Sequence, residues 1–145
     1  MQEFLLNNMP NVSAHWSDFI EAMKDTLIME LWAGIIAFVI GLVLGVVLTV
    51  TKTGGILENK PVYKVIDSVI NLFRSIPFII LLTALMPLSR LVMGTAIYVR
   101  GAIVPLVFGC TPFFTRQVEA ALAETDYGLI EAALSMGSSP VEVIF

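Results

Sequence analysis

The sequence predicts an all-α membrane protein, and three observations lead to that fold class. Hydrophobic residues make up 57% of the 145 residues and charged residues only 14%, whereas charged residues make up about a quarter of a typical soluble domain. Residues 31–51 include no charged side chain, and about 20 helical residues are enough to cross a hydrocarbon core of roughly 30 Å. Two more apolar stretches follow, at about 65–88 and 94–115, and both contain proline. We therefore expect three transmembrane helices with proline kinks, and then a cytoplasmic helix-turn-helix at 116–145.

The segment before the first span, residues 1–30, is expected to lie outside the cytoplasm or at the membrane interface. From Ser13 onward its apolar side chains recur at helical spacing, with charged residues between them. This pattern is typical of a helix that lies on the membrane surface and leads into the first span. It is equally consistent with an extension of the first span, and the residues alone leave both interpretations open.

Two glycines in the first span, Gly41 and Gly45, are four residues apart and therefore share one helix face. Such a small-xxx-small pair lets a second helix approach closely within lipid. The partner could be a neighbouring span or a second copy of the chain, and the sequence does not distinguish them.

The short loop after the first span holds three lysines, Lys52, Lys60 and Lys64. Lysine and arginine are enriched in the cytoplasmic loops of membrane proteins. The loop is therefore predicted to be cytoplasmic and the N-terminus to lie outside. After three crossings, residues 116–145 also reach the cytoplasm.

Pro77 lies in the middle of the second span, where it removes a backbone hydrogen bond and is predicted to bend the helix. Asp67 and Arg74 fall in the first three turns. There the two charges can reach the membrane interface or pair with neighbouring groups. We expect interfacial anchoring to be their main role.

The third span carries Arg100 and two prolines, Pro105 and Pro112, seven residues apart. Each proline frees the carbonyl four residues before it, and a free carbonyl at membrane depth must face protein or a water-filled cavity. Interrupted helices of this kind line transport pathways in many transporters. The alternative is a packing kink whose free carbonyls are satisfied by Thr111 or Thr95, and both interpretations remain open.

The last fifteen residues predict a helix, a glycine corner and a second, capped helix. Gly137 is suited to end the first of these helices, because glycine readily adopts the left-handed conformation found just past a helix end. Ala133 and Gly137 are also four apart, so we expect them to share one helix face and to leave a shallow strip that another backbone can approach closely. Ser139 and Glu142 form a capping-box pattern around Pro140 at the start of the second helix.

These residues resemble a known family. Glu131-Ala132-Ala133, three residues and then Gly137 are similar to the EAA loop of the membrane subunits, or permeases, of bacterial ABC importers. Further stretches resemble the methionine-uptake branch of that family, at 74–82, 87–90, 93–95, 103–106, 112–119 and 126–133. The resemblance covers roughly residues 26–145. The family pattern continues past the glycine with an Ile-x-Leu-Pro element that has no counterpart here, so we expect the chain to be truncated within the EAA loop.

The resemblance implies a function and a set of partners. It implies a multi-pass permease of the bacterial inner membrane that imports methionine, in its D or L form, or a related amino acid by alternating access. The implied partners are an ATP-binding subunit dimer, a second permease copy, an extracytoplasmic substrate-binding lipoprotein and membrane lipid. The chain itself would not be catalytic and would carry no cofactor, because ATP and magnesium would bind to the partner subunit.

The resemblance also implies roles for particular residues. The residues that would couple the permease to the ATP-binding subunit are Asp126, Gly128, Glu131, Ala132, Ala133, Met136 and Gly137. Arg74 could brace the loop that transmits the movement. The residues that could kink or line the pathway are Pro77, Arg100, Pro105 and Pro112.

The sequence gives little support for nucleic-acid binding, metal binding or catalysis. A net charge of −4 argues against a nucleic-acid partner, and one histidine and one cysteine provide no metal-ligand cluster or catalytic dyad. No phosphate-binding loop sequence is present. One alternative function is a small membrane adaptor or regulatory protein that binds a soluble partner through its acidic C-terminal segment. Another is a self-contained secondary transporter or channel, but Arg100 has no acidic partner within its own span.

Overall fold

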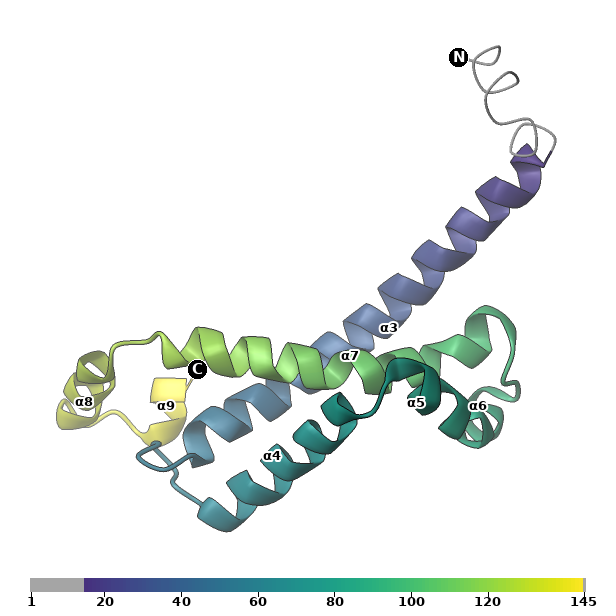
Figure 1. The fold of residues 1–145 in the computed structure, drawn as a ribbon. Coiled ribbons are helices and arrows are strands. Elements are labelled where there is room, and N and C mark those ends of the chain that lie inside the picture. The colour runs from purple at the N-terminus through teal and green to yellow at the C-terminus, as the bar shows by residue number, and fades with distance from the viewer. Residues whose placement is uncertain (1–14, 145) are drawn as a thin grey trace.

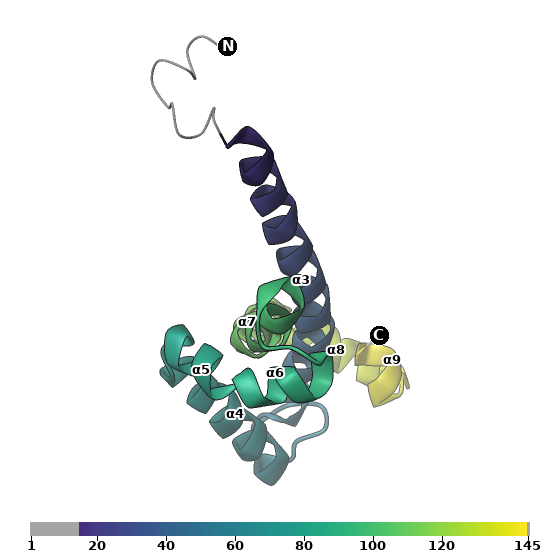
Figure 2. The same ribbon diagram turned by 90° about the vertical axis from the view of Figure 1, so that its right-hand side faces the viewer.

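A computed structural model describes residues 15–144, and every regular element in that range is an α-helix (Figures 1 and 2). Residues 1–14 of the predicted N-terminal segment lie outside the described residues. The predicted all-α fold class is confirmed for the rest. The helices are α3 (Trp16–Thr51), α4 (Lys60–Ser75), α5 (Phe78–Ala84), α6 (Met86–Met93), α7 (Tyr98–Ala123), α8 (Tyr127–Ser135) and α9 (Pro140–Ile144).

The first span belongs to one continuous helix, α3, which begins at Trp16 rather than at Leu31. Residues 16–30 therefore continue the helix of the first span without a break. No proline interrupts these 36 residues, which at 1.5 Å per residue reach about 54 Å. The first turns of α3 therefore project beyond the other helices (Figure 1).

A seam of small residues joins α3 to α7, and the two helices lie side by side in both ribbon views (Figures 1 and 2). A Cβ atom added to Gly41 would lie 2.6 Å from Cβ of Phe114, and one added to Gly45 would lie 2.6 Å from Cβ of Val118. The predicted glycine pair therefore packs against another span of the same chain. The buried residues of α3 continue the same face at three- to four-residue steps: Ala33, Ala37, Gly41, Gly45, Leu48 and Thr51.

The second span is not the single kinked helix that we expected over 65–88. The chain forms α4, α5 and α6 in succession, and the axes of α4 and α5 differ by 104°. Ile76, which precedes Pro77, has an extended backbone (φ −85°, ψ 124°), because the proline ring disfavours helical geometry at the preceding residue. Pro77 then becomes the N-cap of α5. The predicted bend is thus a complete break.

The third span is also longer and more regular than expected over 94–115. Helix α7 runs from Tyr98 to Ala123 and continues through Pro105 and Pro112, both of which are buried. The hydroxyl of Thr111 donates to the carbonyl of Val107 at 2.7 Å, and that of Thr95 donates to Ile97 at 3.3 Å. These two threonines therefore do not bond to the carbonyls four residues before each proline, which one of the two open interpretations assigned to them.

Two of the described helices, α3 and α7, are long and apolar enough to cross a membrane. A third crossing is present if the bent pair of α4 and α5 counts as one span. The segments α5 and α6 lie near the start of α7, whereas α8 and α9 follow its end (Figure 1). Helix α7 therefore connects the two ends of the molecule.

Candidate functional site

The segment α8–α9 holds all seven residues predicted to couple the chain to a motor subunit. It begins at Asp126, the N-cap of α8, whose side chain accepts a hydrogen bond of 2.8 Å from the backbone N–H of Gly128. A Cβ atom at Gly128 would lie only 3.3 Å from the capping oxygen of Asp126. The absence of a side chain at position 128 therefore leaves room for the cap.

The end of α8 has the predicted glycine corner. Gly137 has φ +92°, in the left-handed region, and Met136 is the C-cap. The N–H of Gly137 donates to Leu134 at 3.1 Å, and the N–H of Ser138 donates to Ala133 at 3.1 Å, which is the hydrogen-bond pattern of a Schellman motif. Because Gly137 lies past the helix end, the predicted strip of Ala133 and Gly137 on one helix face is not formed.

The predicted capping box starts α9. The carboxylate of Glu142 accepts a 2.7 Å hydrogen bond from the backbone N–H of Ser139, and the hydroxyl of Ser139 accepts a 3.4 Å bond from the N–H of Glu142. These hydrogen bonds stabilise the ionised carboxylate and lower the pKa of Glu142 below its ordinary value. The corner between α8 and α9 is thus held by backbone and capping bonds.

The surface of α8–α9 is apolar and open. Met136 is 82% exposed, Leu129 67% and Val141 61%, and no residue of either helix is buried. Among the other predicted coupling residues, Glu131 and Ala132 are exposed and Ala133 is half-buried. Exposed apolar side chains beside a carboxylate suit a partner with an apolar groove and basic groups at its rim.

The four residues predicted to kink or line a pathway are not brought together. Pro77 marks the break before α5, whereas Pro105 and Pro112 are buried within α7. Arg100 is exposed in the first turn of α7 and lines a groove with Asp25 of α3. No ion pair joins Arg100 to Asp25 among the described residues.

A polar cluster between α4 and α7 was not predicted as a site. The guanidinium of Arg116 pairs through Nη2 with the carboxylate of Asp67, and also donates to the amide oxygen of Asn71 at 2.9 Å. Its Nη1 donates to Glu119 at 2.6 Å. Asn71 in turn donates to Asp67 at 3.1 Å. The sequence indicated only that Asp67 could find a partner, and did not identify Arg116.

The same cluster lies at the predicted end of the third span. We took Arg116 and Glu119 as the point where the chain leaves the bilayer, and the helix itself continues past them to Ala123. The side chains of Arg116 and Glu119 are only 21% and 18% exposed. Charges that pair within the protein can be accommodated in such a helix, whereas unpaired charges are costly there.

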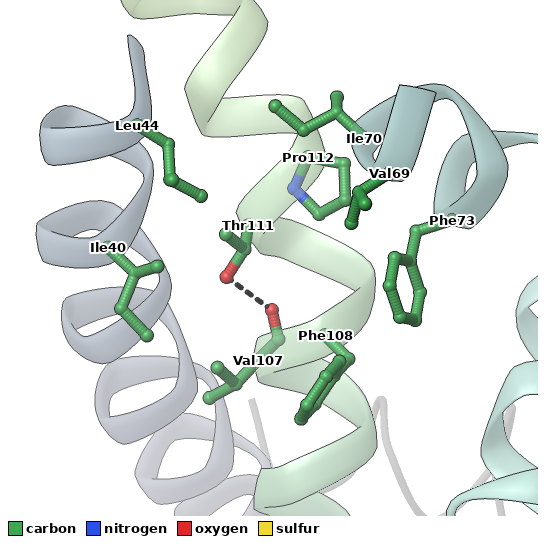
Figure 3. Close-up of a pocket in the computed structure, with 9 residues that line it drawn as sticks. All are labelled: Ile40, Leu44, Val69, Ile70, Phe73, Val107, Phe108, Thr111 and Pro112. Atoms are coloured by element: carbon green, nitrogen blue, oxygen red, sulfur yellow. Dashed lines mark hydrogen bonds between the residues drawn. The ribbon is translucent and has the colours of Figure 1, made fainter. Parts of the chain in front are cut away.

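Next to the polar cluster lies an apolar cavity of about 230 Å³ between α3, α4 and α7. Figure 3 shows its lining, with the hydroxyl of Thr111 turned to the carbonyl of its own helix. The rings of Phe73 and Phe108 meet at one side, with centroids 5.6 Å apart. The lining residues are Ile40, Leu44, Val69, Ile70, Phe73, Val107, Phe108, Thr111 and Pro112.

Known proteins share this sequence and fold. The D-methionine transport system permease protein MetI of Yersinia pestis is 48% identical over 120 residues, which are 83% of this chain and 55% of the relative. The protein of the same name from Escherichia coli K12 is 45% identical over 125 residues, 86% and 58% of the two chains. A solved structure of the MetNI methionine ABC transporter in inward-facing conformations matches with a TM-score of 0.83 and 45% identity, over 86% of this chain and 58% of that one.

The chain thus spans somewhat more than half the length of the curated relatives it matches. The family model described as "binding-protein-dependent transport system inner membrane component" matches residues 38–145. This match includes α4 to α9 and most of the apolar part of α3. The chain therefore belongs to the family of binding-protein-dependent transport system inner membrane components.

Proposed function

We propose that the chain is the permease component of an ATP-driven importer for methionine, in its D or L form, or a related amino acid. The observation that carries the proposal is the exposed apolar surface on α8–α9, held rigid by the Gly137 corner and the capping box. A preorganised surface of this kind loses little entropy when it docks. Membership of the transport family favours this function over a small membrane adaptor.

The proposed orientation has the N-terminus outside and α8–α9 in the cytoplasm of a bacterial cell. The loop with Lys52, Lys60 and Lys64 supports it, because lysines are enriched in cytoplasmic loops. The end of α3 and the end of α7 then lie on the same side, with α4 and α5 forming the returning span. The inner-membrane family agrees with this location.

The proposed mechanism is alternating access, driven by a partner. Two ATP-binding subunits, which carry ATP and Mg²⁺, close on each other and move the α8–α9 segments of two permease copies. Helix α7 passes this movement to the spans because it is continuous from Tyr98 to Ala123. The pathway then opens toward an extracytoplasmic substrate-binding lipoprotein. No catalytic residue and no cofactor are assigned to this chain.

Each coupling residue has a role in the proposed docking. Leu129 and Met136 enter an apolar groove on the ATP-binding subunit, and Glu131 pairs with basic groups at its rim. Ala132 and Ala133 keep the contact close because their side chains are small. Gly137 sets the angle between α8 and α9, since its φ of +92° is strained for other residues.

The first test replaces Gly137 with valine. A side chain has open space at this position, so the main cost is the left-handed backbone, roughly 1–2 kcal/mol. In proteoliposomes that hold the assembled transporter, ATP hydrolysis should continue while uptake of radiolabelled methionine falls sharply. Gly94→Val is the matched control, because Gly94 also has φ +74° and open space but ends α6. Uptake at the wild-type rate in Gly137→Val would reject the proposed coupling role.

The second test measures the orientation. In a Cys110→Ala background, Glu131→Cys should react with a membrane-impermeant maleimide only after the cells are opened. Labelling of intact cells would place α8 outside, where no cytoplasmic ATP-binding subunit could reach it.

A further inference from the structure

Arg116 joins two helices that are otherwise weakly attached. Asp67 and Asn71 lie on α4, and Arg116 lies on α7. The guanidinium contacts both α4 residues and also Glu119 of its own helix. One side chain therefore makes the polar connection between the two spans.

The apolar contact between α4 and α7 is incomplete. Ile70 is the one buried residue of α4, and the cavity of about 230 Å³ separates the helix from α3 and α7 one turn from the cluster. A cavity means that dispersion contacts are missing on one side of its lining. The attachment of α4 to α7 therefore depends strongly on the single residue Arg116, whereas the attachment of α3 to α7 is shared among the residues of the glycine seam.

Arg116 is also close to the predicted coupling segment along the same helix. Seven residues of α7 follow it, and Asp126 caps α8 soon after. A movement of α8 is passed directly to α7 because the connection is short. Helices α5 and α6 contact α7 directly. For the movement to reach α4 as well, α4 must be tied to α7.

We infer that Arg116 is a positioning residue that makes α4 follow α7, and so links the first half of the broken second span to the coupling segment. The inference rests on the proposed import function. Without the guanidinium, the carboxylates of Asp67 and Glu119 lose their shared cation, and α4 is no longer tied to α7. A lysine at position 116 would carry the same charge on a single ammonium group, whereas the planar guanidinium of arginine has two Nη atoms that contact different partners.

The experiment measures distances between spin labels by pulsed EPR in a Cys110→Ala background. One label pair, at Val65 and Ala120, reports on α4 against α7; a second pair, at Val43 and Ala120, reports on α3 against α7. All three positions are exposed. Arg116→Gln should broaden the first distance distribution at least twofold and leave the second unchanged. Asp67→Arg combined with Arg116→Asp should restore the narrow distribution, because the new arginine can contact both position 116 and Glu119.

The second readout is import per ATP hydrolysed by the assembled transporter. Arg116→Gln should lower this ratio about tenfold, within the range of typical coupling effects. Arg116→Lys should give an intermediate ratio. The exchange of Asp67→Arg with Arg116→Asp should recover most of the wild-type import per ATP hydrolysed. Arg90→Gln is the control, since Arg90 is exposed on α6. A loss of stability alone would reduce the amount of transporter but leave the ratio unchanged.

The outcomes separate the two proposals. An unchanged α4–α7 distribution in Arg116→Gln, or an unchanged import ratio, overturns the role of Arg116. A failure of the charge exchange to restore either readout also overturns it. If the wild-type transporter imports no amino acid, the proposed function fails, and the distance distributions still decide whether Arg116 holds α4 to α7.

Discussion

Helix α7 contacts its two neighbouring spans in different ways. Against α3 it forms a close-packed seam in which glycines bring the backbones close, and Thr115 is fully buried. Against α4 it leaves an apolar cavity and closes the contact with the Arg116 cluster. The α3–α7 contact thus depends on close packing, whereas the α4–α7 contact depends on an ion pair and hydrogen bonds.

The difference indicates which parts of the molecule can move. A close-packed seam resists displacement, because any shift creates clashes or voids. A cavity beside a polar connection permits small rotations while the connected residues remain paired. We therefore expect α3 and α7 to act as one rigid unit and α4 to be the adjustable element. The following changes test this contrast, from the largest expected effect to the smallest.

The largest effect is expected from Gly45→Leu in the α3–α7 seam. Even a Cβ atom there would lie 2.6 Å from Val118 and 2.9 Å from the backbone oxygen of Thr115, so the helices must separate. Overpacking of this kind costs about 3 kcal/mol or more. Thermal unfolding in detergent should show the loss. Gly34→Leu, on the same helix but with open space around it, should not destabilise the chain, because leucine favours a helix over glycine by up to about 1 kcal/mol. Equal effects at the two positions would disprove a close seam.

A smaller effect is expected from the Arg116 cluster. A double-mutant cycle of Asp67→Ala and Arg116→Ala should give a coupling free energy of about 1–2 kcal/mol, because the two side chains are in direct contact and mostly buried. The same cycle between Arg74 and Arg116 should give nearly zero, since no contact joins them among the described residues. Urea or thermal unfolding measures both cycles. A coupling energy near zero for Asp67 would show that the pair does not hold α4.

Filling the cavity should have a modest effect of opposite sign. Val107→Ile adds one methylene to the cavity wall and should stabilise the folded chain by about 0.5–1 kcal/mol. If the cavity gives α4 room to rotate, the same variant should also slow import. Val43→Ile, on the exposed face of α3, is the control for both measurements. Destabilisation by Val107→Ile would mean that the cavity cannot accept further volume.

The smallest effect is expected outside the spans, at the capping box of α9. The folded chain lowers the pKa of Glu142, so the carboxylate contributes fully to the cap above the ordinary glutamate pKa of about 4.3. As the pH falls through the lowered folded-state pKa, that contribution is lost. Amide hydrogen exchange in α9 should accelerate over this range after correction for intrinsic rates. Glu142→Gln should remove the pH dependence, and a persistent dependence would assign it to another group.

Much of the local structure could be predicted because it depends on neighbouring residues. Gly137, the Ser139–Glu142 cap and the close approach at Gly41 and Gly45 all follow from short-range geometry, and each is confirmed. The sequence predicted the position of the bend at Pro77 but not its angle. Backbone rules forbid a continuous helix there, whereas the 104° angle depends on how α5 packs elsewhere.

The Arg116 cluster is the part that local reasoning did not predict. Charged residues late in an apolar segment usually mark its end, and by that rule we placed the end of the span near Thr115. In the folded chain Arg116 meets Asp67, 49 residues away in sequence, and the helix continues. No spacing rule predicts a partner at such a separation.

Local patterns in this chain therefore establish which segments are helical, where they are capped and which faces carry small residues. Those properties arise from contacts within one or two helical turns, so a single sequence contains them. Which helix fills the glycine face, how far the chain turns at Pro77 and which carboxylate neutralises Arg116 depend on segments that meet only when the chain is folded. The physical reason is that these contacts are chosen by packing and charge pairing between whole helices.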